Sequence, residues 1–193
     1  MALSFRRRPK GGERQIDRLT GVLDRRQFDR DLATGIDPTE GPTASLWIDV
    51  DHFANHVRRH GAGTTDAVLE RISWVVMATV RSTDIVYRAR HSTFCVLLPA
   101  TTDDAAWKVA SRIRRNVERI PELADAEVTV SIGLAVGASH DLATTVERAD
   151  RALVAGTAHG RNQVFRDGAS ERSRRRARRG RPGAHAVEHA PVT

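Results

Sequence analysis

Three histidines and two aspartates lie close together in the sequence, and their spacing could support metal chemistry. His52, His56 and His60 are four residues apart, so on a helix their imidazoles would line one face beside Asp49 and Asp51. Imidazole and carboxylate groups are common ligands of transition metals, so one interpretation of this pattern is a metal site. The alternative, which we adopt as the prediction, is that His56 and His60 are solvated residues of a surface helix.

Cysteine and tryptophan are the other side chains with distinctive chemistry, and both kinds are predicted to be buried. Cys95 is the single cysteine of the chain, so an intrachain disulfide cannot form. Its apolar neighbours indicate a buried, unreactive thiol. All three tryptophans fall on predicted apolar faces, so we expect them in the core and not as platforms for stacking bases: Trp47, Trp74 and Trp107.

Strands and helices that would position these residues alternate along the chain. The apolar run 44–50 predicts a buried strand, and apolar residues at helical spacing predict a helix over 64–80. Two further strand-like runs, 85–89 and 93–98, are separated by only three residues, which predicts a hairpin.

The second half of the chain continues this alternation. Residues 103–119 predict a strongly basic helix, 127–136 a strand, 141–158 an amphipathic helix and 163–165 a last short strand. Interleaved helices and strands, with one hairpin among them, are typical of an α/β (α+β) domain. We therefore expect a mixed central sheet flanked by helices.

Positive charge is concentrated at the two ends of the chain. The net charge of the 193 residues is +7; residues 1–16 and 167–193 each carry +4, which leaves 17–166 at −1. This predicts a basic N-terminal segment over 1–16, a folded domain over 17–166 and a disordered, arginine-rich tail over 167–193. The basic ends could contact polyanions or anionic membranes weakly, or could simply increase solubility.

Nothing in the sequence resembles a membrane or export signal. No apolar stretch reaches the roughly 18 residues that a membrane-spanning helix needs. At the N-terminus the positive charges follow the few apolar residues, which is the wrong order for a secretory signal. We therefore expect a cytoplasmic protein.

Four separate stretches, in the same order, resemble the GGDEF family of diguanylate cyclase-like domains. Residues 17–28 (DRLTGVLDRRQF) are similar to the opening D-x-L-T-G-L-x-N-R-R-x-F of the family, and 48–53 (IDVDHF) to its D-[IV]-D-x-F strand. Residues 128–133 (VTVSIG) are similar to V-T-x-S-x-G, and 149–162 to the closing A-D-x-A-L-x-x-A-K-x-x-G-R-N. The resemblance covers residues 17–166. It implies a palm-like fold related to nucleotide cyclases and, in active members, a homodimer that condenses two GTP molecules into cyclic di-GMP.

The signature of this family is degenerate in the present chain. Arg90-His91-Ser92-Thr93-Phe94 occupies the G-G-D-E-F position, where glycines give the family turn its φ > 0 freedom. The resemblance implies two divalent cations, one ligand being Asp49 and the other the third signature residue, here Ser92. A hydroxyl is a poor substitute for a carboxylate at such a site, and Thr93 replaces the neighbouring acid. We therefore assign no catalytic residue, treat Asp49 as a vestigial metal ligand, and expect no cofactor other than Mg²⁺ if some activity remains.

The residues that would bind substrate are only partly retained. By the resemblance, the asparagine that reads guanine corresponds to Val57, and the lysine that binds phosphate corresponds to Thr157. The second guanine contact is kept as Asp66, and the arginine after the lysine is kept as Arg161. These last two form a vestigial substrate site.

One ligand site of the family is intact. In many cyclases an R-x-x-D motif five residues before the signature binds cyclic di-GMP as an inhibitor, and Arg81 and Asp84 match it. Arg112 lies where the family often adds another arginine. A guanidinium group can pair with phosphate or guanine, and a carboxylate can accept from guanine N–H groups. Alternatively, Asp84 is a plain residue at the start of a strand.

These features predict a catalytically inactive signalling protein that acts as a cyclic di-GMP receptor through Arg81, Asp84 and Arg112. Two alternatives remain. The domain could be an interaction module, or pseudoenzyme, that regulates an unidentified protein partner and could itself form a homodimer. It could also be a diguanylate cyclase with residual activity.

Overall fold

The computed structural model describes residues 14–36, 41–120 and 128–168. Most of the predicted basic segment 1–16 and of the predicted tail 167–193 therefore lies outside the described residues. The boundaries of the folded domain stay predictions.

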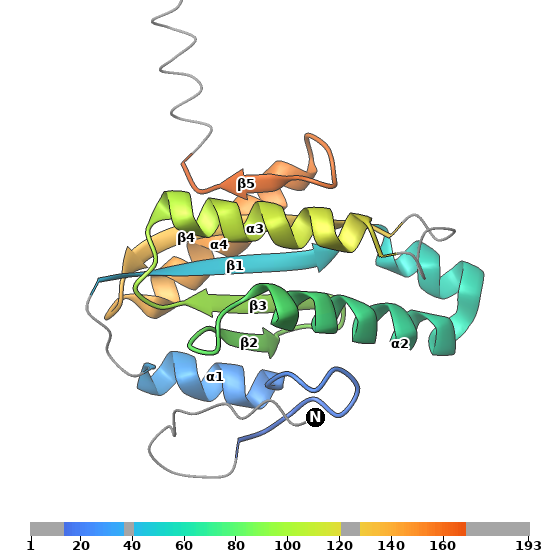
Figure 1. Cartoon of the computed structure of the whole chain (residues 1–193), viewed down its shortest axis with the longest axis horizontal. Helices are drawn as coiled ribbons and strands as arrows, with labels where there is room; N and C mark the ends of the chain where they lie inside the picture. The colour runs from blue at the N-terminus through green and yellow to red at the C-terminus, as the bar shows by residue number, and fades with distance from the viewer. Residues whose placement is uncertain (1–13, 37–40, 121–127, 169–193) are drawn as a thin grey trace, which may run out of the picture.

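A five-stranded mixed sheet forms the middle layer of the domain (Figure 1). Each neighbouring pair among the first four strands of the spatial order is antiparallel, and the fifth strand pairs in parallel with its neighbour. This arrangement confirms the predicted mixed sheet. In spatial order the strands are β2 (Ile85–Arg88), β3 (Thr93–Leu98), β1 (Pro42–Val50), β4 (Val130–Ala138) and β5 (Val164–Arg166).

Helices cover both faces of this sheet, as predicted. On one face, α2 (Phe53–Thr79) and α3 (Asp103–Glu118) lie side by side (Figure 1). On the other face, α4 (Leu142–Thr157) packs against β1 and β4, and α1 (Arg25–Thr34) lies beside β2.

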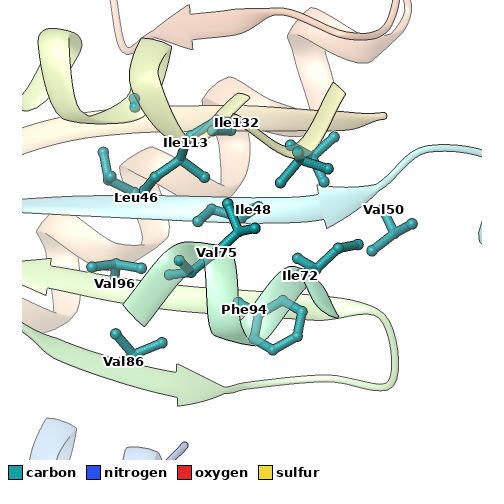
Figure 2. Close-up of a cluster of buried hydrophobic side chains, with 14 of the residues drawn as sticks. Leu46, Ile48, Val50, Ile72, Val75, Val86, Phe94, Val96, Ile113 and Ile132 are labelled. Carbon is teal, nitrogen blue, oxygen red and sulfur yellow. The ribbon is translucent and has the colours of Figure 1, made fainter. Parts of the chain in front are cut away.

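The sheet divides the apolar interior into two cores because successive residues of a strand point to opposite faces. Leu46 and Ile48 of β1 enter the larger core, under α2 and α3, whereas Trp47 enters the smaller one, under α1 and α4. Figure 2 shows the larger core, in which Ile72 of α2 packs on the sheet beside Phe94.

The single cysteine is buried as predicted. Cys95 is fully buried in the smaller core, and its sulfur lies 3.8 Å from the hydroxyl oxygen of Ser45. Burial raises the pKa of the Cys95 thiol to about 12, so the reactive thiolate is scarce at neutral pH.

Two expectations about helices were incomplete. α1 was not predicted, and α2 begins at Phe53 instead of residue 64. The two parts of α2 meet at a kink at Gly61, whose φ of 76° and ψ of 176° are not helical. Among the described residues, no helix is long and apolar enough to cross a membrane.

The expectation that all three tryptophans are buried is wrong for one of them. Trp47 is 3% exposed, and Trp107 packs partly buried against the larger core. Trp74, however, is 62% exposed. Its neighbours Ile72, Val75 and Val76 take the inward face of α2, which leaves Trp74 on the outward face.

Candidate functional site

The position of Asp49, the predicted vestigial metal ligand, is set by the pairing of β1 with β3. This register places Asp49, near the end of β1, directly opposite Thr93, the residue at which β3 begins after the hairpin turn. The hydroxyl of Thr93 donates to Asp49 Oδ1 at 2.9 Å, and the hydroxyl of Ser92 donates to the same oxygen at 3.0 Å. The two side chains at the acidic positions of the signature therefore bind the remaining carboxylate.

The surroundings of Asp49 disfavour its charged form. Burial raises the pKa of the Asp49 carboxyl group, and the hydrogen bonds from Thr93 and Ser92 only partly offset this effect. A site built to hold divalent cations would gather carboxylates around an ion, whereas here one carboxylate is satisfied by two neutral hydroxyl groups.

We expect Asp49→Asn to stabilise the fold at neutral pH. The amide oxygen can still accept from both hydroxyls, and the partly buried charge is removed. Because the folded-state pKa is raised, the stability that Asp49 contributes is fully present at low pH and is lost as the pH rises through that pKa. The advantage of the variant should therefore shrink as the solution is acidified. Urea unfolding at pH 7 and at acidic pH measures this, and a variant less stable than wild type at pH 7 would contradict it.

The second aspartate of this strand end has a structural role. Asp51 is 4% exposed and accepts hydrogen bonds from the hydroxyls of Ser131 and Thr129, both at 2.7 Å, and from the backbone N–H of Asn162 at 2.9 Å. It therefore ties β1 to β4 and to the segment before β5. Three donors make a buried carboxylate acceptable without a metal ion.

The histidine cluster does not form a metal site in the described part of the chain. The rings of His56 and His60 stack with their centroids 6.2 Å apart. Burial, together with the nearby His60 and His52, lowers the pKa of His56. Across 14–36, 41–120 and 128–168, no three side chains from His, Cys, Asp and Glu are arranged to hold a metal ion.

The first residue of the degenerate signature is fixed to the opposite layer of the domain. The guanidinium of Arg90 pairs with the carboxylate of Asp150 on α4 at 2.7 Å. It also lies 4.7 Å from the centre of the Trp47 ring, whose N–H donates to the backbone oxygen of Val146. Residues 90–92 have no positive φ, so this turn closes without the conformational freedom of glycine.

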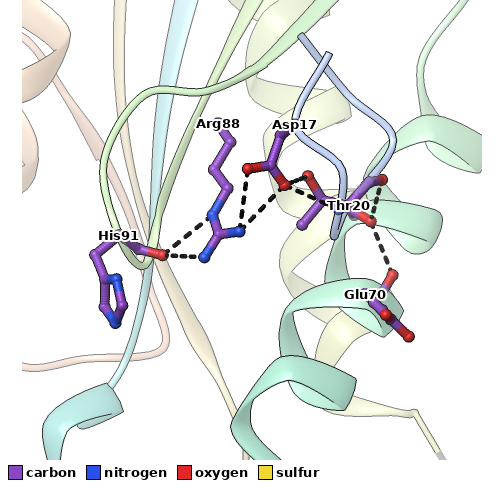
Figure 3. Close-up of polar contacts among 6 residues, drawn as sticks. Asp17, Thr20, Glu70, Arg88 and His91 are labelled. Carbon is purple, nitrogen blue, oxygen red and sulfur yellow. Dashed lines mark hydrogen bonds and ion pairs between the residues drawn. The ribbon is translucent and has the colours of Figure 1, made fainter. Parts of the chain in front are cut away.

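Arg88 also fixes the hairpin turn, through an ion pair with Asp17 and a hydrogen bond to His91 (Figure 3). Arg88 donates to both carboxylate oxygens of Asp17, at 3.1 and 3.3 Å, and to the backbone oxygen of His91 at 2.9 Å. Asp17 also accepts from the backbone N–H and the hydroxyl of Thr20. Burial raises the pKa of Asp17, but the hydrogen bonds from Thr20 and Arg88 outweigh this effect and hold the pKa below its ordinary value.

Sequence reasoning missed the roles of Arg88 and Arg90. The retained opening motif pointed to Asp17, but nothing in the sequence pairs it with an arginine 71 residues away. The ion pairs of Arg90 with Asp150 and of Arg88 with Asp17 both fix the hairpin turn to neighbouring parts of the domain. The turn therefore has a structural role in this chain.

The three residues predicted to bind cyclic di-GMP lie around the connection from α2 to β2. Asp84 is 3% exposed; its Oδ2 accepts from the backbone N–H of Arg81 at 2.7 Å, and its own N–H donates to Arg81 O. Burial raises the pKa of Asp84 although this hydrogen bond acts to lower it. Arg81 is exposed, and Arg112 donates from α3 to the backbone oxygen of Thr79 at 2.6 Å. Asp84 therefore shapes the turn, while Arg81 faces solvent.

The four positions predicted from the resemblance to correspond to substrate contacts are partly exposed and partly packed into the fold. Asp66 and Arg161 are both exposed, the first beyond the kink of α2 and the second before β5. Val57, in place of the guanine-reading asparagine, packs against the larger core. The hydroxyl of Thr157, in place of the phosphate-binding lysine, donates to the backbone oxygen of Val154. Both replacements thus make local contacts within the fold.

Comparisons with known proteins agree on one family. Residues 14–163 match the family described as "Diguanylate cyclase, GGDEF domain". Diguanylate cyclase A of Treponema denticola is 37% identical over 125 residues, which are 62% of this chain and 33% of that protein. Diguanylate cyclase DosC of Escherichia coli K12 is 33% identical over 158 residues, 77% of this chain and 34% of that protein. The chain thus spans about a third of the length of these relatives.

Solved structures give the same result. The coiled coil and GGDEF domain of DgcB from Caulobacter crescentus, in complex with c-di-GMP, superposes with a TM-score of 0.69 at 25% identity, covering 78% of this chain and 84% of that one. Diguanylate cyclase SiaD from Pseudomonas aeruginosa, in complex with its activator SiaC, gives a TM-score of 0.70 at 27% identity over 78% of this chain and 61% of that one. The chain therefore belongs to the GGDEF domain family of diguanylate cyclases.

Proposed function

We propose that this GGDEF domain is catalytically inactive and serves as a receptor for cyclic di-GMP. The observation that carries the first part is the cluster of Asp49, Ser92 and Thr93, in which hydroxyl groups stand where the family has carboxylates. The residues present do not fit the two divalent cations of an active member, since Asp49 carries the one carboxylate among these three residues and the other two offer hydroxyl groups. Arg90, bound to Asp150, also replaces the first glycine of the signature.

Purified protein supplied with GTP and Mg²⁺ or Mn²⁺ should therefore make no cyclic di-GMP. Without a second acidic ligand the triphosphate is not neutralised, and Val57 offers no hydrogen bond to guanine. Chromatography of the reaction mixture measures the product, with an active diguanylate cyclase as the positive control. Metal-dependent product from homogeneous protein would show that the domain is still an enzyme.

The receptor part of the proposal is supported by the arrangement around Arg81. Binding of a phosphate-containing ligand requires hydrogen bonds and complementary charge, and it does not require the catalytic cations. The turn that carries Arg81 is fixed by Asp84, and Arg112 is held near the end of α2 by its bond to Thr79. DgcB was solved in complex with c-di-GMP, which makes this ligand the natural first choice.

Arg81→Ala should weaken cyclic di-GMP binding roughly ten- to hundredfold, which corresponds to about 1–3 kcal/mol for a charge-assisted hydrogen bond. Arg81 is the suitable residue to change because it is exposed, whereas removing the Asp84 carboxylate would also disturb the turn. Calorimetric titration measures the affinity, with GTP titrated in parallel.

Ser92→Ala is the matched control, because Ser92 lies in the hairpin turn and should leave cyclic di-GMP affinity unchanged. If wild-type protein gives no saturable heat at high micromolar cyclic di-GMP, the receptor proposal fails. The interaction module that regulates a protein partner then becomes the better explanation.

A further inference from the structure

The outward side of α2 and α3 carries one exposed indole ring among basic side chains that form no ion pair in the described residues. On α3, Lys108, Arg112, Arg115 and Arg119 follow helical spacing and are all exposed. Within the part of the chain that the structure describes, none of these four forms a salt bridge. On α2, Trp74 is 62% exposed. We call this surface the α2–α3 face.

The two helices bring these side chains to one surface. They lie side by side and run in opposite directions, as the colours of Figure 1 show. Arg112 and Asn116 of α3 both hydrogen-bond to Thr79 at the end of α2, at 2.6 and 3.3 Å. Because the helices are antiparallel, Arg115 and Arg119 extend from this contact alongside the turns of α2 that carry Trp74.

The opposite side of the sheet also carries basic side chains, and some of them are paired with acids: Arg25 with Asp29 on α1, and Arg90 with Asp150 on α4. Arg26 and Arg30 of α1 are exposed and form no salt bridge within the described residues, but no tryptophan, tyrosine or phenylalanine ring is exposed beside them. Exposed positive charge next to an exposed indole is therefore particular to the α2–α3 face. This combination attracts a negatively charged surface and offers it an apolar side chain to bury.

We propose that the α2–α3 face binds the surface of an anionic phospholipid bilayer. Arginine and lysine side chains near a membrane are attracted by acidic headgroups, and tryptophan inserts its apolar ring at headgroup depth while its N–H stays with polar groups. Two helices side by side on a sheet present a broad surface, which suits a bilayer.

The surroundings of Trp74 favour lipid over single-stranded nucleic acid. Proteins that bind single strands stack successive bases on several aromatic rings. In the described ranges Trp74 is the one exposed ring of tryptophan, tyrosine or phenylalanine, and its exposed neighbours on α2 are Ala67, Glu70, Arg71 and Ala78. A single indole resembles a membrane anchor more than a row of base platforms.

The test uses the full chain and vesicles of phosphatidylcholine with or without phosphatidylglycerol. Binding is measured by co-sedimentation at low salt, and insertion by the emission of Trp74, since Trp47 is buried and the ring of Trp107 is covered by Arg166. We expect binding only with phosphatidylglycerol, a shift of emission to shorter wavelength, and weaker binding as salt is added. Trp74→Ala should abolish that shift.

Charge reversal distinguishes this face from the basic ends of the chain, which also attract anionic lipid. Arg115→Glu with Arg119→Glu should weaken binding at least about tenfold, whereas Arg26→Glu with Arg30→Glu, an equally spaced exposed pair on α1, should weaken it less than about threefold. Neither pair belongs to the proposed cyclic di-GMP site, so the result does not depend on that function. Equal losses from both pairs, no binding to phosphatidylglycerol, or quenching of Trp74 by an oligonucleotide without vesicle binding would each overturn the proposal.

Discussion

Replacing Phe94 with alanine should lower the free energy of unfolding by about 3–5 kcal/mol, the range for removing a buried aromatic side chain. Phe94 is fully buried in the larger core, directly opposite Ile48 in the β1–β3 register. It is also the one residue of the signature that this chain keeps. The expected loss would show that the surviving signature residue is retained for packing.

His91→Ala is the matched control for this measurement. His91 lies three residues earlier in the same signature and is exposed, with its ring 5.3 Å from that of Phe53. Losing an exposed ring contact should cost less than about 1 kcal/mol. Urea unfolding of both variants gives the comparison, and similar losses for the two would mean that Phe94 is not a core residue of the kind described.

Hydrophobic periodicity predicted the elements that bury a continuous apolar face. The strands β1 and β3 are buried along nearly their whole length, and the second part of α2 has apolar residues at helical spacing. α1 was missed because it is mostly polar and buries only Gln27 and Phe28. A surface helix was expected at His56 and His60, but the apolar spacing did not join it to 64–80, since 53–60 holds histidines and arginines.

The error at Trp74 has a similar physical origin. A large apolar residue within an apolar stretch was assigned to the core by its type, but a helix can turn only one side toward a sheet. Ile72 and Val76 occupy that side in the larger core, and Trp74 lies between them in sequence on the other side.

Motif comparison located the site residues but not the contacts that decide their role. The positions of Asp49, Ser92 and Thr93 followed from matching the motifs, whereas the hydrogen bonds among them require strand register. The pairing of Arg90 with Asp150 joins residues 60 positions apart on different elements, and local patterns hold no information about it. Asp84 is likewise 3% exposed in the folded domain, and the local sequence pattern at the connection from α2 to β2 does not indicate this burial.

The second large loss of stability is expected from substituting Gly133 of β4, where α4 approaches the sheet closely. A Cβ atom added there would collide with the backbone oxygen of Ala149 and would lie 2.6 Å from the backbone nitrogen of Leu153. Both are backbone atoms of α4, so no side chain can rotate away and the helix itself must shift. This explains why glycine occupies the last position of the stretch 128–133, which resembles V-T-x-S-x-G, although β4 itself continues to Ala138.

Gly133→Ala should therefore lower the free energy of unfolding by about 2–3 kcal/mol, as expected when a methyl group is forced into a packed core. Gly63→Ala is the matched control, because Gly63 lies within α2 and an added Cβ would meet no atom within 4 Å. That substitution should raise stability by about 0.4–1 kcal/mol, since alanine restricts the unfolded chain and favours the helix. Thermal and urea unfolding measure both changes. If the two substitutions shift stability in the same direction, α4 does not approach the sheet as closely as described.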